Sequence, residues 1–256
     1  MDIIYKKIID KVLASGKRLR ERAGKIRDIG ITKRDLTEED IRIERELKEI
    51  INEFNPEHGF YAEEENADFF QAEDVWVADP ISGTKIFING SPHYGIVVSH
   101  LHNQKVQFAV VYDPSVGELY TAYRSKGAFL NDQRIILPQI IAEKPKIIFN
   151  LSAGWKDHVL AEKIEKVLNA YNLSKVAGSF AVKECWVAHG KFNGVVTLAK
   201  DTFPQFASSL IIKEAGGILT NLAGEEDIRP DDRVFIGGGR ATHSKLLPLV
   251  REVFRE

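Results

Sequence analysis

Residues 76–85 read WVADPISGTK: an apolar run, then Asp79, then a turn that contains proline and glycine, then Thr84. The apolar run predicts a buried strand over 75–78. A carboxylate at the end of a strand is well placed to bind a hard cation. A Gly-Thr turn that begins a helix offers backbone N–H groups to an anion. Two interpretations stay open: a metal-bridged phosphate site, or a strand-to-helix turn in which Asp79 caps the helix.

Composition limits the class of protein. The chain has 256 residues, 44% of them hydrophobic and 28% charged, which is typical of a folded protein with a sizeable core. The net charge of −2 gives no basic excess for a nucleic-acid partner. The lone cysteine, Cys185, excludes an intramolecular disulfide and a cysteine-based zinc cluster. Because we find no signal-peptide pattern and no apolar run long enough to span a bilayer, we expect a soluble, cytoplasmic protein with no membrane partner.

The segments before and after this stretch differ in pattern. Apolar residues recur at helical spacing over 3–13, and a second helix is predicted over 37–54, with Thr37 as its N-cap and Asn55-Pro56 as its end. Further along, strands are predicted over 94–101, 106–112 and 118–123, separated by turn residues. This order predicts an antiparallel meander behind two helices.

The final part of the chain alternates between strands and helices. Strands are predicted over 147–149, 194–198, 218–219 and 234–236, and helices over 157–171, 179–189, 206–215 and 242–254. The stretch 138–145 predicts a boundary between an N-terminal α+β half, 1–138, and a C-terminal α/β half, 139–256. We therefore predict an α+β/α/β sandwich of alternating helix and sheet layers, with the site between its halves.

Several motifs, in this order and spacing, resemble the inositol monophosphatase family of magnesium-dependent, lithium-sensitive phosphatases. Members of that family read Gly-Glu-Glu, Asp-Pro-Ile/Leu-Asp-Gly-Thr, Trp-Asp-x-Ala-Ala and Glu-Ala-Gly-Gly. Here residues 62–64 read AEE, 79–84 read DPISGT and 214–217 read EAGG. Segments 108–114, 126–131 and 178–181 also look like parts of the family pattern. The resemblance covers nearly the whole chain, and it implies the family's fold and a homodimer.

The resemblance also implies a Mg²⁺ site and a catalytic group. Glu63, Asp79 and the carbonyl oxygen of Ile81 match the family's ligands of one metal. Thr84 and Asp40 match the pair that orients the attacking water. The resemblance thus makes Asp40, Glu63 and Thr84 the expected catalytic residues.

A second set of residues matches the parts of the family that bind substrate. Gly83 and Thr84 match the phosphate-binding turn, and Gly178 and Phe180 fall in the substrate-recognition segment. Lys85 follows the Gly-Thr pair, as it often does in the family's bisphosphate-nucleotidase branch, where it could contact a second phosphate. The alternative is a solvated lysine on the first helical turn.

Two positions depart from the family pattern. The second aspartate of the metal motif is Ser82 here, and the later aspartate, ten residues before Glu214, is Pro204. Neither residue supplies an anionic ligand, so a second cation site beside Asp79 should be nearly abolished. Asp201 could substitute for the missing acid if the backbone takes another route. Like Lys85, Lys200 and His93 are candidates for contacting a second phosphate, with a surface lysine and a satisfied core histidine as the alternatives.

These observations predict a Mg²⁺-dependent phosphomonoesterase that acts on a small phosphorylated metabolite, such as an inositol or sugar phosphate, with weak turnover. Two alternatives stay open. One is a catalytically impaired homologue that binds a phosphorylated metabolite or a partner, and the other is a bisphosphate nucleotidase. A carboxylate in the position of the missing acids favours the enzyme, whereas an apolar residue or a lysine there favours the binder.

Overall fold

The computed structural model describes residues 2–30, 35–63, 72–138 and 143–255. The helices in these ranges are α1 (Ile3–Arg22), α2 (Glu38–Phe54), α3 (Thr84–Ile88), α4 (His158–Leu168), α5 (Phe180–Ala188), α6 (Phe203–Glu214) and α7 (Arg240–Val253). The strands are β1 (Gly59–Ala62), β2 (Asp74–Ser82), β3 (Gly95–His102), β4 (Lys105–Asp113), β5 (Glu118–Tyr123), β6 (Gly127–Leu130), β7 (Gln133–Ile135), β8 (Lys146–Leu151), β9 (Asn172–Ser174), β10 (Gly194–Leu198), β11 (Ile218–Asn221) and β12 (Val234–Gly238). No helix in these ranges has the length and apolar character that crossing a bilayer requires.

The first sheet contains β1 to β7 paired in chain order. Only β1 and β2 run parallel among these pairs, so the predicted antiparallel meander is confirmed over β2–β5. The sequence missed β1, β6 and β7, which have three or four residues each and so show too little alternation to be recognised. The predicted strand 75–78 was too short, because β2 continues through Asp79 to Ser82.

The second sheet has the order β11-β12-β10-β8-β9. It is mixed: β10 pairs parallel with β8 and antiparallel with β12. The predicted strands of this half are confirmed as β8, β10, β11 and β12, while the three-residue β9 was missed. The change of sheet falls between Ile135 and Lys146, next to the predicted boundary, which itself stays a prediction.

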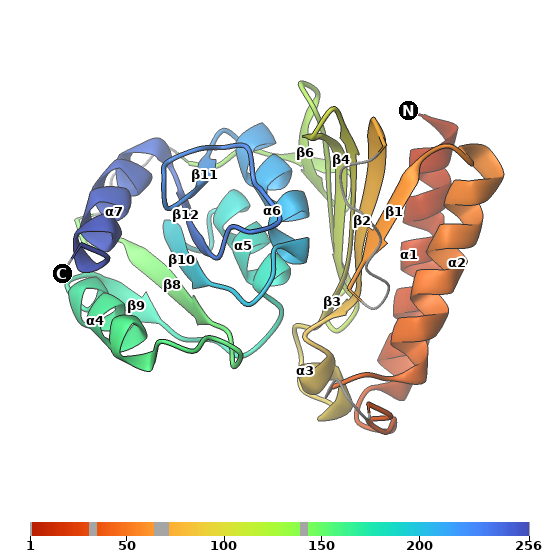
Figure 1. Ribbon diagram of the computed structural model, residues 1–256, viewed down its shortest axis with the longest axis horizontal. Helices are drawn as coiled ribbons and strands as arrows, with labels where there is room; N and C mark the ends of the chain where they lie inside the picture. Colours follow the sequence, from red (N-terminus) through yellow and green to blue (C-terminus); the bar gives the residue numbers. More distant parts are fainter. Residues whose placement is uncertain (1, 31–34, 64–71, 139–142, 256) are drawn as a thin grey trace.

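The predicted arrangement of alternating layers is confirmed (Figure 1). Helices α1 and α2 cover one face of the first sheet, α5 and α6 lie between the two sheets, and α4 and α7 cover the outer face of the second sheet. Each interface between layers has its own apolar core. The central core includes Cys185 and Trp186, so both are packing residues. This arrangement brings the end of β2 close to the start of α5 and α6.

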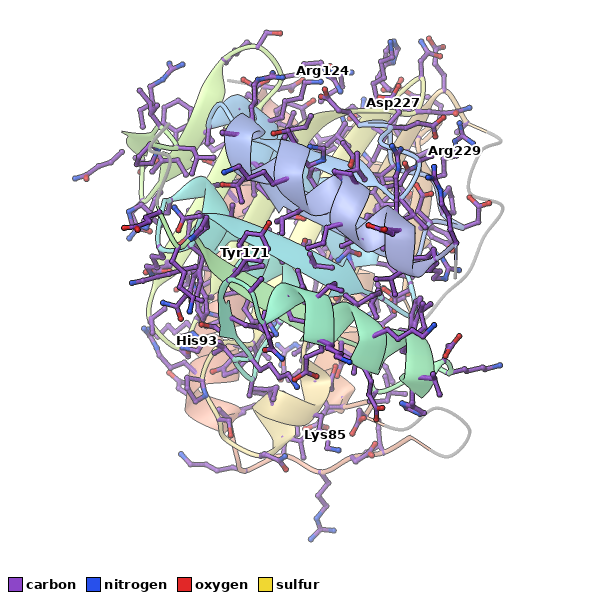
Figure 2. All side chains as sticks on the ribbon, turned by 90° about the vertical axis from the view of Figure 1, so that its left-hand side faces the viewer. Lys85, His93, Arg124, Tyr171, Asp227 and Arg229 are labelled. Atoms are coloured by element: carbon purple, nitrogen blue, oxygen red, sulfur yellow. The ribbon has the colours of Figure 1, made fainter. Side chains whose placement is uncertain are left out.

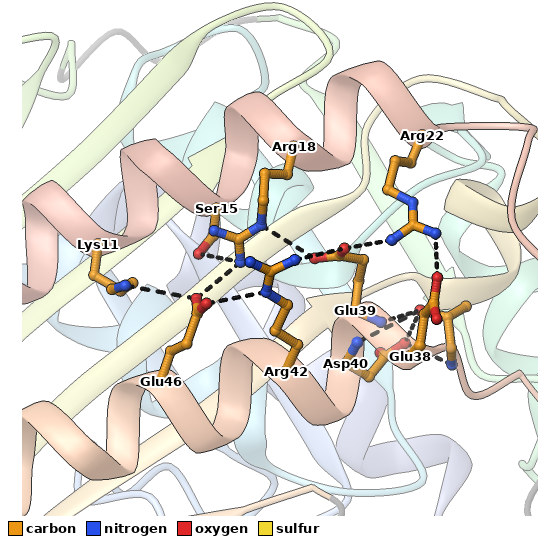
Figure 3. Close-up of polar contacts among 10 residues, drawn as sticks. Lys11, Ser15, Arg18, Arg22, Glu38, Glu39, Asp40, Arg42 and Glu46 are labelled. Atoms are coloured by element: carbon orange, nitrogen blue, oxygen red, sulfur yellow. Dashed lines mark hydrogen bonds and ion pairs between the residues drawn. The ribbon is translucent and has the colours of Figure 1, made fainter.

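A network of charges fixes α1 against the first turn of α2 (Figure 3). Glu39 is only 1% exposed and accepts hydrogen bonds from Arg18 Nε at 3.4 Å and Arg22 Nη1 at 2.7 Å. Arg18 also donates to Glu46 at 2.8 Å, and Arg22 to Glu38. Buried charges need such partners, because a carboxylate without them would pay a large desolvation cost. The network therefore holds the segment that carries Asp40.

A second polar cluster lies at the far end of β2, around Asp74. Trp76 Nε1 donates to His58 Nδ1 at 3.1 Å, and the Tyr5 hydroxyl lies 2.9 Å from His100 Nδ1. Because an indole N–H only donates, His58 Nδ1 is the acceptor of this bond, and its Nε2 atom lies 3.6 Å from Glu57 Oε1 and 3.9 Å from Asp74 Oδ2. His100 Nε2 lies 2.9 Å from Asp74 Oδ1. These hydrogen bonds tie α1 and the segment before β1 to the first sheet.

We predict that Glu39→Ala lowers the free energy of unfolding by about 2 kcal/mol, because Arg18 and Arg22 lose their buried partner but can still be hydrated. Urea unfolding followed by circular dichroism measures the change. The control is Glu49→Ala, since Glu49 is 69% exposed and its contact with Arg45 is 3.9 Å long. Equal effects of the two substitutions would contradict the role given to the network.

We also predict that stability falls on acidification. Burial lowers the pKa of His100 to about 4, although the Asp74 carboxylate raises it. The unfolded chain, with a histidine pKa near 6.5, therefore binds a proton between about pH 6.5 and 4 that the folded chain does not. The expected loss is up to about 3 kcal/mol over this window. In urea unfolding between pH 7.5 and 4.5, His100→Gln should flatten this dependence, whereas substitution of the exposed His158 by Gln should leave it unchanged.

Candidate active site

All of the predicted site residues except Asp40 line one cavity of about 240 Å³. The end of β2, the start of α3, the segment after β8, the start of α5 and the segment between β10 and α6 contribute to its wall. Figure 2 shows Lys85 and His93 at the end of the molecule that carries α3, whereas Arg124, Asp227 and Arg229 lie at the opposite end. The lining residues are Asp35, Glu63, Asp79, Ile81, Ser82, Gly83, Thr84, Lys85, Leu151, Ser152, Ala153, Gly178, Ser179, Phe180, Ala199, Lys200, Asp201, Pro204 and Gln205.

Asp79 is the most buried of the carboxylates that line this cavity. It is 4% exposed and lies inside β2, where the pairing with β3 shifts register between Asp79 and Ser82. Its Oδ1 atom has no hydrogen-bond partner among the residues that the structure describes. Burial raises the pKa of Asp79 well above its usual range, and the carboxylates of Glu63 and Asp201 raise it further. An ionised Asp79 therefore requires a cation.

The interpretation of Asp79 as a helix cap is wrong. The N-cap of α3 is Gly83, and no side chain caps this helix. Gly83 has a φ of 84°, in the left-handed region that favours glycine, and an added Cβ would lie 3.3 Å from the backbone nitrogen of Ser179. The turn thus presses against the start of α5, and this close contact explains why glycine stands there.

Thr84 and Asp40 are brought together, as predicted. Thr84 Oγ1 lies 2.8 Å from the carbonyl oxygen of Ile81 and 3.2 Å from Asp40 Oδ1, so one hydroxyl proton serves either acceptor. The predicted N-cap Thr37 is confirmed, and it forms a capping box in which Asp40 Oδ2 accepts from the Thr37 backbone N–H at 2.8 Å. Asp40 is only 2% exposed and reaches the cavity through Thr84.

On the opposite wall, Lys200 pairs with two acids. Its Nζ atom lies 3.1 Å from Glu63 Oε1 and 3.7 Å from Asp201 Oδ2. Burial lowers the pKa of Lys200, but Glu63 and Asp201 outweigh this and raise it to about 12. A carboxylate alone near Ser82 and Pro204 would have favoured the enzyme, and a lysine alone would have favoured the binder. The cavity contains both, the Asp201 carboxylate and Lys200, so this criterion does not separate the two. The residues 64–71 that follow Glu63, including the rest of the acidic run, lie outside the described residues.

The two positions that depart from the family pattern are both structural. Ser82 Oγ accepts a hydrogen bond of 2.8 Å from Ser179 Oγ, and Ser179 is the N-cap of α5. Pro204 lies in the first turn of α6, where proline is well tolerated. The next residue, Gln205, is fully buried, donates to Glu184 at 3.1 Å, and has an Oε1 atom without a partner.

The predicted substrate residues also line this cavity. Lys85 is exposed on α3, and Gly178 and Phe180 flank the N-cap of α5. Gly178 has a φ of 139°, and an added Cβ would lie 2.8 Å from both the Cβ and the carbonyl oxygen of His93. His93 Nδ1 lies 2.9 Å from Asp113 Oδ2, so this histidine has a structural partner, as the core alternative predicted.

Sequence reasoning missed Asp35, Ser179, Gln205 and the segment after β8. Ser179 carried a usable signal, because a serine at the start of a predicted helix is a favoured N-cap. No sequence signal marks Gln205 or Leu151–Ala153, because local pattern does not tell which end of a strand or helix will face a cavity. The Asp201 and Lys200 side chains were considered, but their contact with Glu63 could not be anticipated.

The chemistry of the cavity fits one divalent cation. Glu63 and Asp79 supply carboxylate oxygens, and the Ile81 carbonyl accepts one hydrogen bond, which leaves it a second lone pair. Such hard oxygen donors are those that Mg²⁺ prefers. The unpartnered Oδ1 of Asp79 is the observation that most directly requires a cation.

Comparison with known proteins agrees with this geometry. Residues 4–255 match the inositol monophosphatase family. The chain belongs to that family. It is 30% identical over 247 residues to the fructose-1,6-bisphosphatase/inositol-1-monophosphatase of Aquifex aeolicus, covering 94% of this chain and 92% of the relative. It is 34% identical over 186 residues to the putative Nus factor SuhB of Neisseria meningitidis serogroup B, covering 70% of each chain.

A solved structure gives the same result for the fold. The inositol monophosphatase of Thermotoga maritima superposes with a TM-score of 0.86 at 26% sequence identity, covering all of this chain and 99% of the other. The family resemblance and the predicted fold class are therefore confirmed. The relatives support a phosphatase, but their names differ, so they leave the substrate open.

We predict that Asp79→Asn stabilises the metal-free protein by about 1 kcal/mol, because it replaces a buried carboxylate, held beside the acids Glu63 and Asp201, with a neutral amide. The same substitution should abolish the increase in melting temperature that Mg²⁺ gives, since ligand-induced stabilisation requires binding to the folded chain. Thermal unfolding in EDTA and in Mg²⁺ measures both. Asp231→Asn, at an exposed position, is the control and should change neither. A Mg²⁺ effect that survives in Asp79→Asn would contradict the predicted metal site.

Proposed function

We propose that the protein is a Mg²⁺-dependent phosphomonoesterase that hydrolyses a small phosphate ester, such as an inositol or sugar phosphate, with weak turnover. The observation that carries this proposal is the convergence of Asp79, Thr84 and Asp40 beside the Gly83 turn, with Asp79 Oδ1 unpartnered. Few structural roles require a buried carboxylate among other carboxylates, whereas a cation site does.

Thr84 and Asp40 are proposed to hold the attacking water. A water in the cavity can donate a hydrogen bond to Thr84 Oγ1, while the Thr84 hydroxyl donates its own proton to Asp40 Oδ1 at 3.2 Å. Attack of the water oxygen on phosphorus forms the new P–O bond and breaks the ester P–O bond, one water proton moves through Thr84 toward Asp40, and the leaving oxygen takes a proton from solvent to depart as an alcohol. The capping box, which engages Asp40 Oδ2, fixes the orientation of this carboxylate.

Glu63, Asp79 and the Ile81 carbonyl are the residues proposed to hold Mg²⁺. When bound, Mg²⁺ supplies Lewis-acid charge that polarises the phosphoryl oxygens and lowers the pKa of water. The Gly83 turn is proposed to take the phosphate, with Gly178 and Phe180 facing the rest of the substrate and Lys85 at the rim of the cavity. A cavity of about 240 Å³ suits a small ester.

Two other functions are tested by the same assay. Lys85 lines the cavity, which keeps a bisphosphate nucleotide among the candidate substrates. The SuhB relatives are named Nus factors, which keeps a partner-binding role without turnover as the alternative. If the protein binds a partner in this way, the expectation that it has no nucleic-acid partner would need a separate test. The homodimer and the cytoplasmic location stay predictions.

The first experiment is a phosphate-release screen over inositol phosphates, sugar phosphates and bisphosphate nucleotides, with Mg²⁺ or EDTA. We expect slow, Mg²⁺-dependent release from a monoester. Thr84→Val should lower kcat at least a hundredfold, because the water loses a hydrogen-bond partner. Thr121→Val serves as a control for the fold, since this buried residue lies in β5 within the first sheet. Release from no ester by a protein that binds Mg²⁺ would favour the partner-binding alternative.

We further predict that Ser82→Asp and Pro204→Asp raise turnover together but not singly. One added acid leaves a second cation with too few anionic ligands, whereas two restore the family pattern around Asp79, so the effects should be non-additive. A tenfold gain corresponds to about 1.4 kcal/mol of barrier. Stability must be measured in parallel, because Ser82 bonds to Ser179 and Pro204 begins α6. A double variant that is folded but slower than the wild type would contradict the lost-metal interpretation.

A further inference from the structure

The wall of the cavity is strongly acidic. Glu63, Asp79 and Asp201 line it, and Asp40 reaches it through Thr84. These carboxylates come from the end of β1, from β2, from the segment before α6 and from α2, so the fold itself brings them together. Like charges held this close repel each other unless a cation lies among them.

Both ion pairs and packing of its aliphatic stem hold Lys200 among these acids. Its Nζ atom contacts Glu63 at 3.1 Å and Asp201 at 3.7 Å. Its aliphatic stem lies over Gly154, where an added Cβ would come within 3.2 Å of the Lys200 Cβ and 3.7 Å of its Cδ. The other lining lysine, Lys85, is exposed like Lys200 but lies on α3. Lys200 thus links the first sheet to the second through a contact between residues 137 positions apart.

The positions of Ser82 and Pro204 leave this lysine as the cation next to the acids. Ser82 offers a neutral hydroxyl that already accepts a hydrogen bond from Ser179, and Pro204 offers no side-chain ligand. A lysine ammonium is a compact point charge with three N–H donors. Two of these donors can serve Glu63 and Asp201, which leaves the third for a phosphoryl oxygen.

We propose that the Lys200 ammonium is a resident cation of this site: it competes with the divalent cation for Glu63 and binds the phosphoryl group of the substrate. The inference rests on the proposed function, because it assumes that a phosphate enters the same cavity. In this proposal the Lys200 side chain supplies part of the positive charge that neutralises the phosphate. Removing Lys200 should therefore strengthen cation binding and weaken anion binding, a pair of opposite changes that loss of a structural contact would not give.

The test compares the wild type with Lys200→Met, Lys200→Arg and Lys213→Met. Lys213 is the matched control: its side chain is 49% exposed against 52% for Lys200, it pairs with Glu226 at 2.7 Å, and it lies at the opposite end of α6. Mn²⁺ affinity is measured from the electron paramagnetic resonance of free Mn²⁺. Inorganic phosphate affinity is measured by calorimetry, once in EDTA and once in saturating Mn²⁺.

We expect Lys200→Met to bind Mn²⁺ at least tenfold more tightly and phosphate at least tenfold more weakly than the wild type. Lys200→Arg, which keeps the charge, should stay close to the wild type, and Lys213→Met should match it. Unchanged Mn²⁺ and phosphate affinities in Lys200→Met would overturn the proposal, and so would two changes in the same direction.

The outcome is separate from that of the proposed phosphatase. A wild type that binds Mn²⁺ and phosphate but releases phosphate from no ester would refute the proposed function, while the opposite shifts in Lys200→Met would still support the lysine. Conversely, a wild type that hydrolyses an ester, together with a Lys200→Met variant that is unchanged in both affinities, would support the phosphatase and refute the role of Lys200.

Discussion

A carboxylate held away from water inside a strand is the constraint around which this site is arranged. Asp79 is buried in β2, its Oδ1 has no hydrogen-bond partner, and neighbouring acids raise its pKa further. Burying an unpaired charge destabilises a fold, so the surrounding structure must hold Asp79 in place at a net cost. The apolar residues of β2, which pack into cores on both faces of the first sheet, provide that support. A cation would remove the cost, and this is the physical reason to expect one.

The sequence predicts those parts of the fold that depend on local pattern. The N-cap of α2 at Thr37, the meander β3–β5 and the alternating second half follow from side-chain periodicity and turn residues, and all are found. Strands of three or four residues escaped because their pattern is too short, and β9 is the example in the second sheet. Asp79 was placed after its strand because proline suggested a break, whereas β2 accommodates Pro80 at a shift of register.

The candidate site was predictable only in part, for a different reason. The pairing of Asp40 with Thr84 came from the family resemblance, and the structure brings the two side chains to 3.2 Å. The contact between Lys200 and Glu63 joins segments 137 residues apart and depends on how two sheets pack, which no local pattern encodes. The sequence shows that positions 82 and 204 carry no acid. That Lys200 lies beside Glu63 could be seen only from the folded structure.

The same packing explains why Ser82 is more than a missing ligand. Its hydroxyl accepts a hydrogen bond from Ser179, which in turn accepts from the backbone N–H of Val182 at the start of α5. The strand of the metal motif is thus joined directly to the N-terminus of a helix from the second half of the chain. An aspartate at position 82 would have to share this position with the cap of α5. The Ser82 hydroxyl that links the two halves of the chain and the Lys200 ammonium beside Glu63 are therefore compatible features of one site, since each occupies its own part of the cavity wall.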